Sequence, residues 1–222
     1  MKISYLILSL GLLIMACQTA QQQQKAAMEK AGQALKSAVN VQNAKALVSS
    51  CEAYTLAFPD DKKSVSEYIA GMAPVLDTLL GNLRNTILDE ASGKINQEAA
   101  ADFVQLSEAF ATLAAESDKA PEWLFQAGDV AGSLRDYDKT LALYQRINEQ
   151  YPNYERAPQV LFMRAFTLDN ELKQLEQARA LYQAFLEKYP DNEFADDAQF
   201  LLDNLGKSEE EIIQSFLKKQ QQ

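Results

Sequence analysis

Apolar and polar positions between Trp123 and Ala195 follow the same order twice, with one constant offset that is the step from Ala127 to Ala165. The pairs in which both copies carry the same residue are Ala127/Ala165, Leu134/Leu172, Ala142/Ala180, Leu143/Leu181, Tyr144/Tyr182, Gln145/Gln183, Glu149/Glu187, Tyr151/Tyr189, Pro152/Pro190, Glu155/Glu193 and Ala157/Ala195. An ungapped repeat with a period of about 20 to 50 residues is typical of a solenoid. The pattern therefore predicts an all-α protein built from stacked helical hairpins.

Each copy predicts two helices, A and B. Helix A has apolar residues spaced four, three and four positions apart, which is the spacing of one helix face. They are Trp123, Ala127, Val130 and Leu134 in the first copy and Leu161, Ala165, Leu168 and Leu172 in the second. Helix B ends before the proline of each copy, because the residue before a proline is disfavoured in the α region. Its apolar residues include Leu143, Tyr144 and Ile147, or Leu181, Tyr182 and Phe185.

Weaker copies of the pattern lie on both sides of this pair. Residues 25–40 and 42–58 predict a helical hairpin whose end resembles that of helix B, with Cys51 at the position of Tyr144. Residues 191–205 begin a third copy. We expect Cys51 to be a buried small hydrophobe. The alternative, a reactive thiol, requires exposure and a cationic neighbour.

Two further helices are expected between these copies. A leucine stripe from Leu76 to Leu83, continued by Ile87, predicts a helix that restarts at Pro74 and is stopped at Ser92-Gly93. An apolar stripe from Ala99 to Leu113 predicts the next helix, over roughly residues 96–116.

Two capping boxes predict helix starts. In a capping box, a Ser or Thr and a Glu or Gln three residues later bond to each other's backbone N–H. Ser64 with Glu67 predicts one helix start, and Ser208 with Glu211 predicts a last helix near the end of the chain.

The first residues have the pattern of a targeting segment. The apolar run from Ile3 to Ala16 is short for a membrane span, which needs about 20 residues. Ile14-Met15-Ala16-Cys17 resembles the lipobox of bacterial lipoproteins, which implies a signal peptide over residues 1–16 and lipid attachment at Cys17. The alternative is an ordinary cleaved leader with an incidental cysteine. Residues 17–24, rich in Gln, are expected to form a tether. By the same resemblance, Gln18 after the cysteine implies the outer membrane, facing the periplasm.

Charge and composition argue against several classes of function. The net charge of −10 disfavours nucleic acid, because binding to phosphates is driven by Lys and Arg. The chain has no histidine, which removes the commonest general base and metal ligand. We therefore expect no enzyme activity, no metal and no cofactor.

The repeat resembles the tetratricopeptide repeat (TPR) family, although its period is a few positions longer than that of the family, which is about 34 residues. The matching residues are Trp123, Ala127, Val130, Tyr137, Thr140, Tyr144 and Pro152, then Leu161, Ala165, Leu168, Leu175, Ala178, Tyr182 and Pro190. The resemblance implies an α–α superhelix in which helix A lines a partner groove. The candidate groove residues are Phe125, Gln126, Asp129, Met163, Arg164, Thr167 and Asn170.

The sequence thus predicts a degenerate TPR-like region over residues 25–118, and TPR repeats with C-terminal capping helices over residues 119–222. The expected function is that of a lipid-anchored periplasmic adaptor for protein or peptide partners. The chain resembles TPR lipoproteins of outer-membrane assembly and TPR proteins associated with the Tol–Pal system. Two alternatives stay open, namely a self-associating structural scaffold and a carboxylate-based hydrolase of envelope glycans. The oligomeric state and the partner are not predicted.

Overall fold

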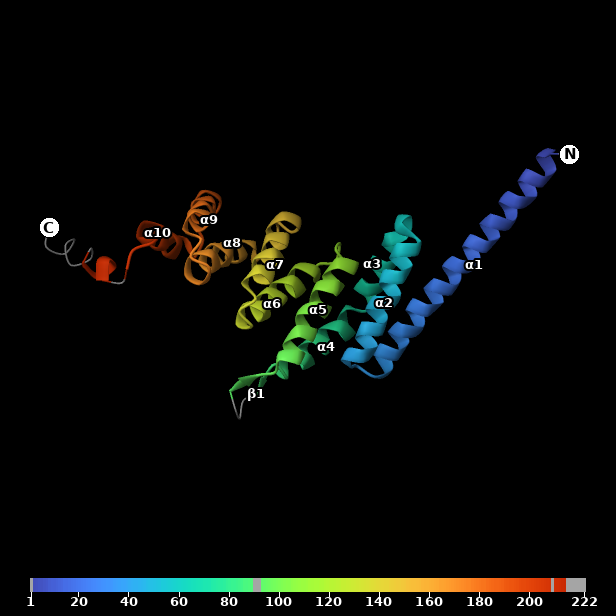
Figure 1. Ribbon diagram of the computed structural model, residues 1–222, viewed down its shortest axis with the longest axis horizontal. Helices are drawn as coiled ribbons and strands as arrows, with labels where there is room; N and C mark the ends of the chain where they lie inside the picture. Colours follow the sequence, from blue (N-terminus) through green and yellow to red (C-terminus); the bar gives the residue numbers. More distant parts are fainter. Residues whose placement is uncertain (1, 90–92, 209, 215–222) are drawn as a thin grey trace. The chain divides into compact units, whose positions relative to one another are not determined.

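The computed structural model describes residues 2–89, 93–208 and 210–214, and it is built almost entirely of helices (Figure 1). The chain divides into two compact units, Met1–Val130 and Ala131–Gln222, which we describe separately. The elements of unit 1 are α1 (Lys2–Ser37), α2 (Val41–Ala57), the 3₁₀ turn η1 (Pro59–Asp61), α3 (Lys62–Gly71), α4 (Ala73–Asn85), β1 (Leu88–Asp89), β2 (Lys94–Ile95), α5 (Gln97–Leu113) and most of α6 (Ala120–Ser133). The predicted all-α fold of helical repeats is confirmed.

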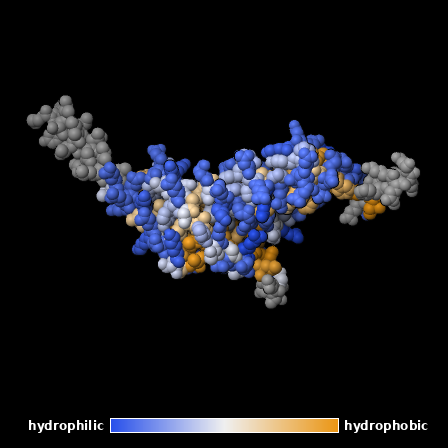
Figure 2. Space-filling view, turned by 180° about the vertical axis from the view of Figure 1, so that it is seen from behind, coloured by the Kyte–Doolittle hydropathy of each residue, from blue (hydrophilic) through white to orange (hydrophobic). Residues whose placement is uncertain are grey.

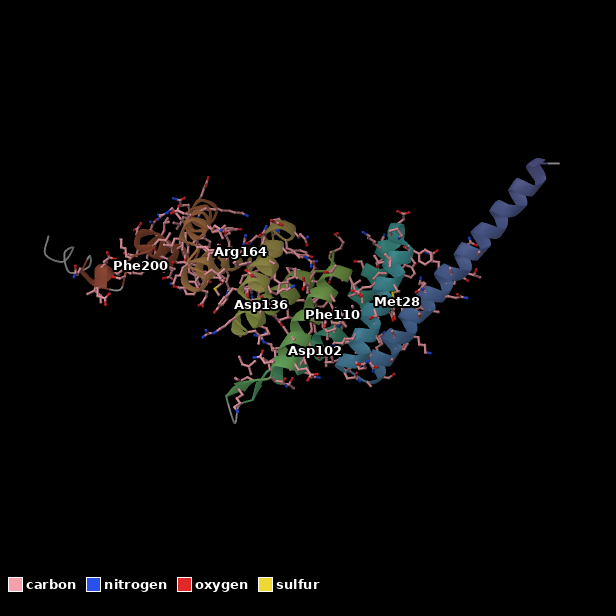
Figure 3. All side chains as sticks on the ribbon, viewed as in Figure 1. Met28, Asp102, Phe110, Asp136, Arg164 and Phe200 are labelled. Carbon is pink, nitrogen blue, oxygen red and sulfur yellow. The ribbon has the colours of Figure 1, made fainter. Side chains whose placement is uncertain are left out.

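Helices α1 and α2 form the predicted hairpin and lie side by side in Figure 1. The α1 side chains of Met28, which Figure 3 labels, and of Leu35 are fully buried, as are Leu47 and Cys51 of α2. The turn between the helices is closed by Asn40, whose side chain accepts a 2.9 Å hydrogen bond from the backbone N–H of Asn43. Such an N-cap satisfies one of the donors left free at a helix start.

The Gln-rich segment 17–24 is helical, because α1 runs through it without a break. Its role as a tether therefore stays a prediction, while its conformation is that of a continuous helix. None of the helices in the described part of the chain combines the length and the hydropathy that a membrane crossing needs.

Helices α3 and α4 meet at the predicted interruption, since α3 ends at Gly71 and α4 has Pro74 in its first turn. The capping box predicted at Ser64 is wrong. Helix α3 begins two positions earlier, at Lys62, and the Ser64 hydroxyl donates a 2.7 Å hydrogen bond to Asp61 Oδ1. The 3₁₀ turn η1 directly precedes α3, so the backbone is already helical at Ser64.

The segment after α4 differs from the sequence prediction. The helix ends at Asn85 rather than continuing through Ile87, and a short antiparallel hairpin pairs Leu88 with Ile95. Asn, Thr and Ile all have weak helix propensity, and Gly93 takes a φ of +67°, which favours a turn. An insertion between α4 and α5 results, and Figure 2 shows it as a hydrophobic spot on the surface.

The core of unit 1 continues through α4, α5 and α6. The rings of Phe110 and Trp123 lie 6.0 Å apart at 64°, an edge-to-face contact. The Trp123 indole N–H donates a 2.8 Å hydrogen bond to Asp77 Oδ1, and Lys119 forms a 3.0 Å ion pair with the same carboxylate. A large aromatic ring thus fills the space between helices while its polar atom is satisfied.

Unit 2 reproduces the repeat in its geometry. Its elements are α7 (Tyr137–Gln150), α8 (Ala157–Phe166), the π-helical turn η2 (Thr167–Glu171), α9 (Leu175–Lys188) and α10 (Ala195–Asn204). Helices α7 and α9 begin and end at equivalent positions of the two sequence copies, and α8 and α10 are related by the same offset. Helix α10 is therefore the start of the predicted third copy.

The ends of the B helices also repeat. The backbone N–H of Tyr151 bonds to the carbonyl of Ile147, and the N–H of Tyr189 bonds to Phe185 in the same way, at 2.9 and 2.8 Å. Phe58, at the end of α2, has nearly the same φ and ψ as these two tyrosines and the same bond. The resemblance of α2 to helix B thus extends to its C-cap.

The turns between helices A and B share a residue with positive φ but differ in their backbone hydrogen bonds. Arg135 and Lys173, which occupy equivalent positions in the two copies, both have positive φ, at 62° and 54°. The first turn closes with a hydrogen bond from the Asp136 N–H to the Ala131 carbonyl, as in a Schellman motif. In the second turn, the π-helical η2 widens the last turn of the helix.

Phe162 is the centre of the core of unit 2. Its ring contacts those of Phe194, Phe185, Tyr182 and Phe166, at centroid distances of 5.1, 5.9, 6.1 and 6.3 Å. The equivalent of Phe162 in the third copy is Phe200, which is exposed (Figure 3). Terminal repeats of solenoids are atypical in this way because one side faces water.

The capping box at Ser208 and Glu211 is confirmed. The Ser208 N–H donates to Glu211 Oε2 at 2.8 Å, and the Glu211 N–H donates to Ser208 Oγ at 3.2 Å. Residues 215–222, where the predicted last helix continues, lie outside the described residues.

Candidate functional site

Arg164 is the predicted groove residue with the most distinctive surroundings. It projects from α8 toward α7 (Figure 3), where one terminal nitrogen lies 3.3 Å from Asn148 Oδ1 and the other 3.5 Å from Gln145 Oε1. Its Nε is buried without an acceptor among the described residues. Burial lowers the pKa of the Arg164 guanidinium, and the nearby carboxylate of Glu149 opposes this shift. The guanidinium stays charged but has hydrogen-bonding capacity to spare.

The other predicted groove residues of unit 2 divide into exposed and buried ones. Asn170 is exposed and Met163 is half-buried against the core. Thr167 is only 6% exposed, and its hydroxyl donates a 2.8 Å hydrogen bond to the carbonyl of Met163. This bond directs the hydroxyl onto the backbone of its own helix. Thr167 is therefore not part of the surface that a partner can touch.

In unit 1, the predicted groove residues lie on α6. The Gln126 amide donates a 2.7 Å hydrogen bond to Glu122 Oε1, and both residues are partly exposed, as is Asp129. Phe125 is 5% exposed, so its ring belongs to the core and not to an open surface. Helix α6 carries Trp123, Leu124 and Phe125 in succession, and all three are buried. Its apolar face is therefore wider than the spacing of apolar residues in the sequence predicts.

A groove that the sequence analysis missed lies between α2 and α5 in unit 1. It encloses about 920 Å³, and its apolar lining includes Val48, Leu56, Leu106, Ala109 and Leu113. The charged or polar lining residues are Lys45, Ser49, Glu52, Thr55, Lys62, Gln105, Glu108 and Thr112.

One ion pair borders this groove. Lys45 Nζ lies 2.5 Å from Asp102 Oδ1 and joins α2 to α5, in the region where Figure 3 labels Asp102. Leu56, on the rim, is 86% exposed. The signal that could have identified the groove is the position of Leu56, which lies off the apolar face of α2 that carries Leu47, Cys51 and Tyr54.

A polar cluster joins α1 to the end of α2, only one helical turn after Cys17. The Gln21 amide donates 3.0 Å hydrogen bonds to the Tyr54 hydroxyl and to Asp61 Oδ2, and the Tyr54 hydroxyl also donates to Asp61 Oδ2. The hydrogen bonds from Tyr54 and Ser64 hold the pKa of Asp61 below its ordinary value. These hydrogen bonds therefore hold α1 against the end of α2 within one helical turn of Cys17.

Cys51 is buried, as predicted. Burial, with a smaller effect of Glu52, raises the pKa of the Cys51 thiol to about 12. A thiol reacts as the thiolate, so this environment suits packing and not nucleophilic chemistry. Across the part of the chain that the structure describes, no group of three Cys, Asp or Glu side chains is arranged to hold a metal ion.

Comparison with known families bears on the repeat pair. The family model of the tetratricopeptide repeat matches residues 124–154 and 159–192. The first segment contains most of α6 and all of α7, and the second contains most of α8 and all of η2 and α9. Comparisons with curated proteins and with solved structures found no match. The protein therefore has an all-α fold of TPR-like helical repeats, and repeats of this kind are typical of protein–protein interaction scaffolds.

Proposed function

We propose that the protein is a non-enzymatic adaptor, anchored through a lipid on Cys17 to the outer membrane and facing the periplasm, that binds protein partners of the cell envelope. The observation that carries the proposal is the TPR match over residues 124–154 and 159–192. Solenoids of stacked helical hairpins offer an extended surface for a segment of another protein.

The surface of α8 is the part of unit 2 best suited to a partner. The guanidinium of Arg164 holds its two neutral partners at 3.3 and 3.5 Å, which are long distances for an N–H···O bond. A carboxylate forms shorter, charge-assisted bonds to guanidinium than an amide oxygen does. Arg164 therefore favours an acidic residue of the partner, with Asn170 exposed on the same repeat.

The proposed anchor rests on the sequence of residues 14–17. Two or more acyl chains give stable membrane binding, where one chain is marginal. Because Gln21 is bonded to Tyr54 and Asp61, a lipid on Cys17 holds unit 1 close to the membrane surface.

The anchor is tested by fatty-acid labelling, which should be lost in Cys17→Ser. Partner binding is tested by crosslinking and affinity recovery of the anchored protein from its own envelope. Arg164→Ala should lower recovery of the partner about 10-fold or more if Arg164 is a hot spot. The matched control is Arg179→Ala on α9, which should leave recovery unchanged. Recovery of no protein above background, with labelling intact, contradicts the adaptor proposal.

A further inference from the structure

Hydrogen bonds between α1 and the segment that follows α2 determine which end of unit 1 lies nearest Cys17. Gln21 follows Cys17 by one turn of α1, which is about 6 Å at a rise of about 1.5 Å per residue. The Gln21 amide donates hydrogen bonds to Tyr54 and Asp61, at 3.0 Å in both cases. The end of α2, η1 and the start of α3 therefore lie at nearly the level of Cys17 along α1. We name residues 56–63 the anchor-end loop.

The anchor-end loop exposes apolar side chains. Leu56 is 86% exposed, the highest value among the exposed large hydrophobic residues that the structure describes, although burial of a leucine is favourable by about 1.5–3 kcal/mol. Pro59 is exposed, and Phe58 is half-buried with its ring 5.2 Å from that of Tyr54. Leu56 and Pro59 also line the α2–α5 groove together with Leu113, so the apolar surface continues from the loop onto α5. Contiguous exposed apolar surface is typical of a contact with a protein or a membrane.

The charges of the anchor-end loop cancel. The loop contains two acids, Asp60 and Asp61, and two bases, Lys62 and Lys63. Lys63 forms a 3.6 Å ion pair with Glu67, whereas Lys62 is exposed and has no ion pair within the described residues. A contact made by this loop is therefore driven by its apolar side chains and not by net charge. The stem of a lysine can lie along an apolar surface while its ammonium group reaches a polar one.

We propose that the anchor-end loop lies on the phospholipid surface to which Cys17 is anchored, with Leu56 in the apolar part of the interface and the ammonium group of Lys62 at the phosphates. The inference rests on the proposed lipid anchor and deepens it, because it states which surface of unit 1 the membrane covers. The step of about 6 Å from Cys17 to Gln21 compares with the about 5–10 Å to which interfacial helices bury their apolar faces. The anchor is thus close enough to the loop to bring it into the interface.

An exposed leucine at the opposite end of unit 1 serves as a control. Helices α2 and α5 run in the same direction, since Lys45 pairs with Asp102 near their starts, while Leu56 and Leu113 line the groove near their ends. The hairpin that carries Leu88 directly precedes α5 and lies at the starting end (Figure 1). The part of α2 from Lys45 to Leu56 alone separates the two ends by about 16 Å. A membrane that covers the anchor-end loop therefore leaves Leu88 in water.

Quenching of tryptophan fluorescence by brominated phospholipid provides the first test. The chain from Cys17 onward, made without a lipid, is coupled through the Cys17 thiol to a maleimide lipid in phosphatidylcholine vesicles, and the buried Cys51 stays unlabelled. We expect brominated phospholipid to quench the added fluorescence of Leu56→Trp but not that of Leu88→Trp. Trp123, which is 2% exposed, gives a constant background. Equal quenching at both positions, or no quenching at position 56, overturns the proposal.

Membrane binding through a single acyl chain provides the second test, with the native leucine in place. One chain on Cys17 gives marginal, reversible binding, so a small additional contact is measurable. We expect Leu56→Ser to weaken binding to phosphatidylcholine vesicles about 10-fold or more, the equivalent of one buried leucine. Leu88→Ser should leave binding unchanged, and so should added salt, because the loop has no net charge. Unchanged binding of Leu56→Ser, or binding that is lost in high salt, contradicts the proposal.

Failure of this inference is distinguishable from failure of the proposed anchor. In both tests the lipid is attached chemically, so the result does not depend on acylation in the cell. Wild-type protein that takes up no fatty acid in the cell overturns the anchor and the inference that rests on it. Protein that takes up fatty acid, but in which Leu56→Trp is not quenched, overturns the membrane contact of the loop and leaves the anchor intact.

Discussion

Gly32 is the position at which the packing of α1 is tested most sharply. A Cβ atom added at Gly32 would lie 2.0 Å from the Tyr68 hydroxyl oxygen, 2.9 Å from its Cζ and 3.1 Å from its Cε1. The same hydroxyl donates a 3.4 Å hydrogen bond to the carbonyl of Glu29. Gly32→Ala therefore forces the Tyr68 ring away from α1 and loses this bond.

Two opposing effects set the size of the change. Replacing glycine by alanine inside a helix stabilises it by about 0.5–1 kcal/mol. Forcing extra atoms into a packed contact costs about 1–3 kcal/mol. Gly81, in α4, has no atom within 4 Å of an added Cβ, so Gly81→Ala shows the first effect alone. The obstacle is the outer end of the Tyr68 side chain, which can turn aside, so the difference between the two variants isolates a packing cost at the low end of this range, about 1 kcal/mol.

The assay is the free energy of unfolding from chemical denaturation of wild type and both variants. We expect Gly81→Ala to be more stable than wild type and Gly32→Ala to be less stable than Gly81→Ala. In a Tyr68→Ala background, Gly32→Ala should become stabilising, because its obstacle is gone. Equal stabilisation by both alanines in the wild-type background refutes the close approach of α1 and α3.

Four further predictions concern single side chains. Ser107→Ala should raise the free energy of unfolding by about 1–2 kcal/mol, because its hydroxyl is buried without a partner among the described residues and alanine favours helix. Gln174→Asp should stabilise α9 by about 1 kcal/mol in the same assay, since Gln174 has nearly the φ and ψ of Asp136 but no capping bond; destabilisation refutes this. Asp61→Asn should destabilise the protein at pH 7, and the difference from wild type should shrink below about pH 4, because a depressed pKa adds stability that is lost as pH falls through it. The Cys51 thiol should resist maleimide in the native protein and react after denaturation; fast native labelling contradicts its burial.

The repeat was predictable from the sequence because its hydrophobic spacing sets helix bounds directly. The offset between Tyr144 and Tyr182 reappears as equivalent bounds of α7 and α9 and as matching C-caps. The burial of Cys51 followed from its alignment with Tyr144. These features depend on residues that are close together in the sequence, so they can be predicted without knowledge of distant contacts.

The features that sequence analysis missed depend on tertiary contacts or on competing local preferences. The helix was extended past Asn85 because Ile87 continued the apolar spacing, although weak helix formers precede the turn at Gly93. The α2–α5 groove requires two helices that are far apart in the sequence to meet, which periodicity does not reveal. Thr167 is a predicted groove residue, but tertiary packing buries its side chain.

Site-specific photo-crosslinking in the native envelope tests the central claim, that the TPR surface binds a protein partner, most directly. A photoreactive residue is placed at Asn170, exposed beside the α8 surface, and in a matched protein at Glu187, exposed on α9. The account predicts a discrete protein adduct from position 170 that is absent or much weaker from position 187. Equal labelling from both positions, or no adduct from position 170, contradicts it.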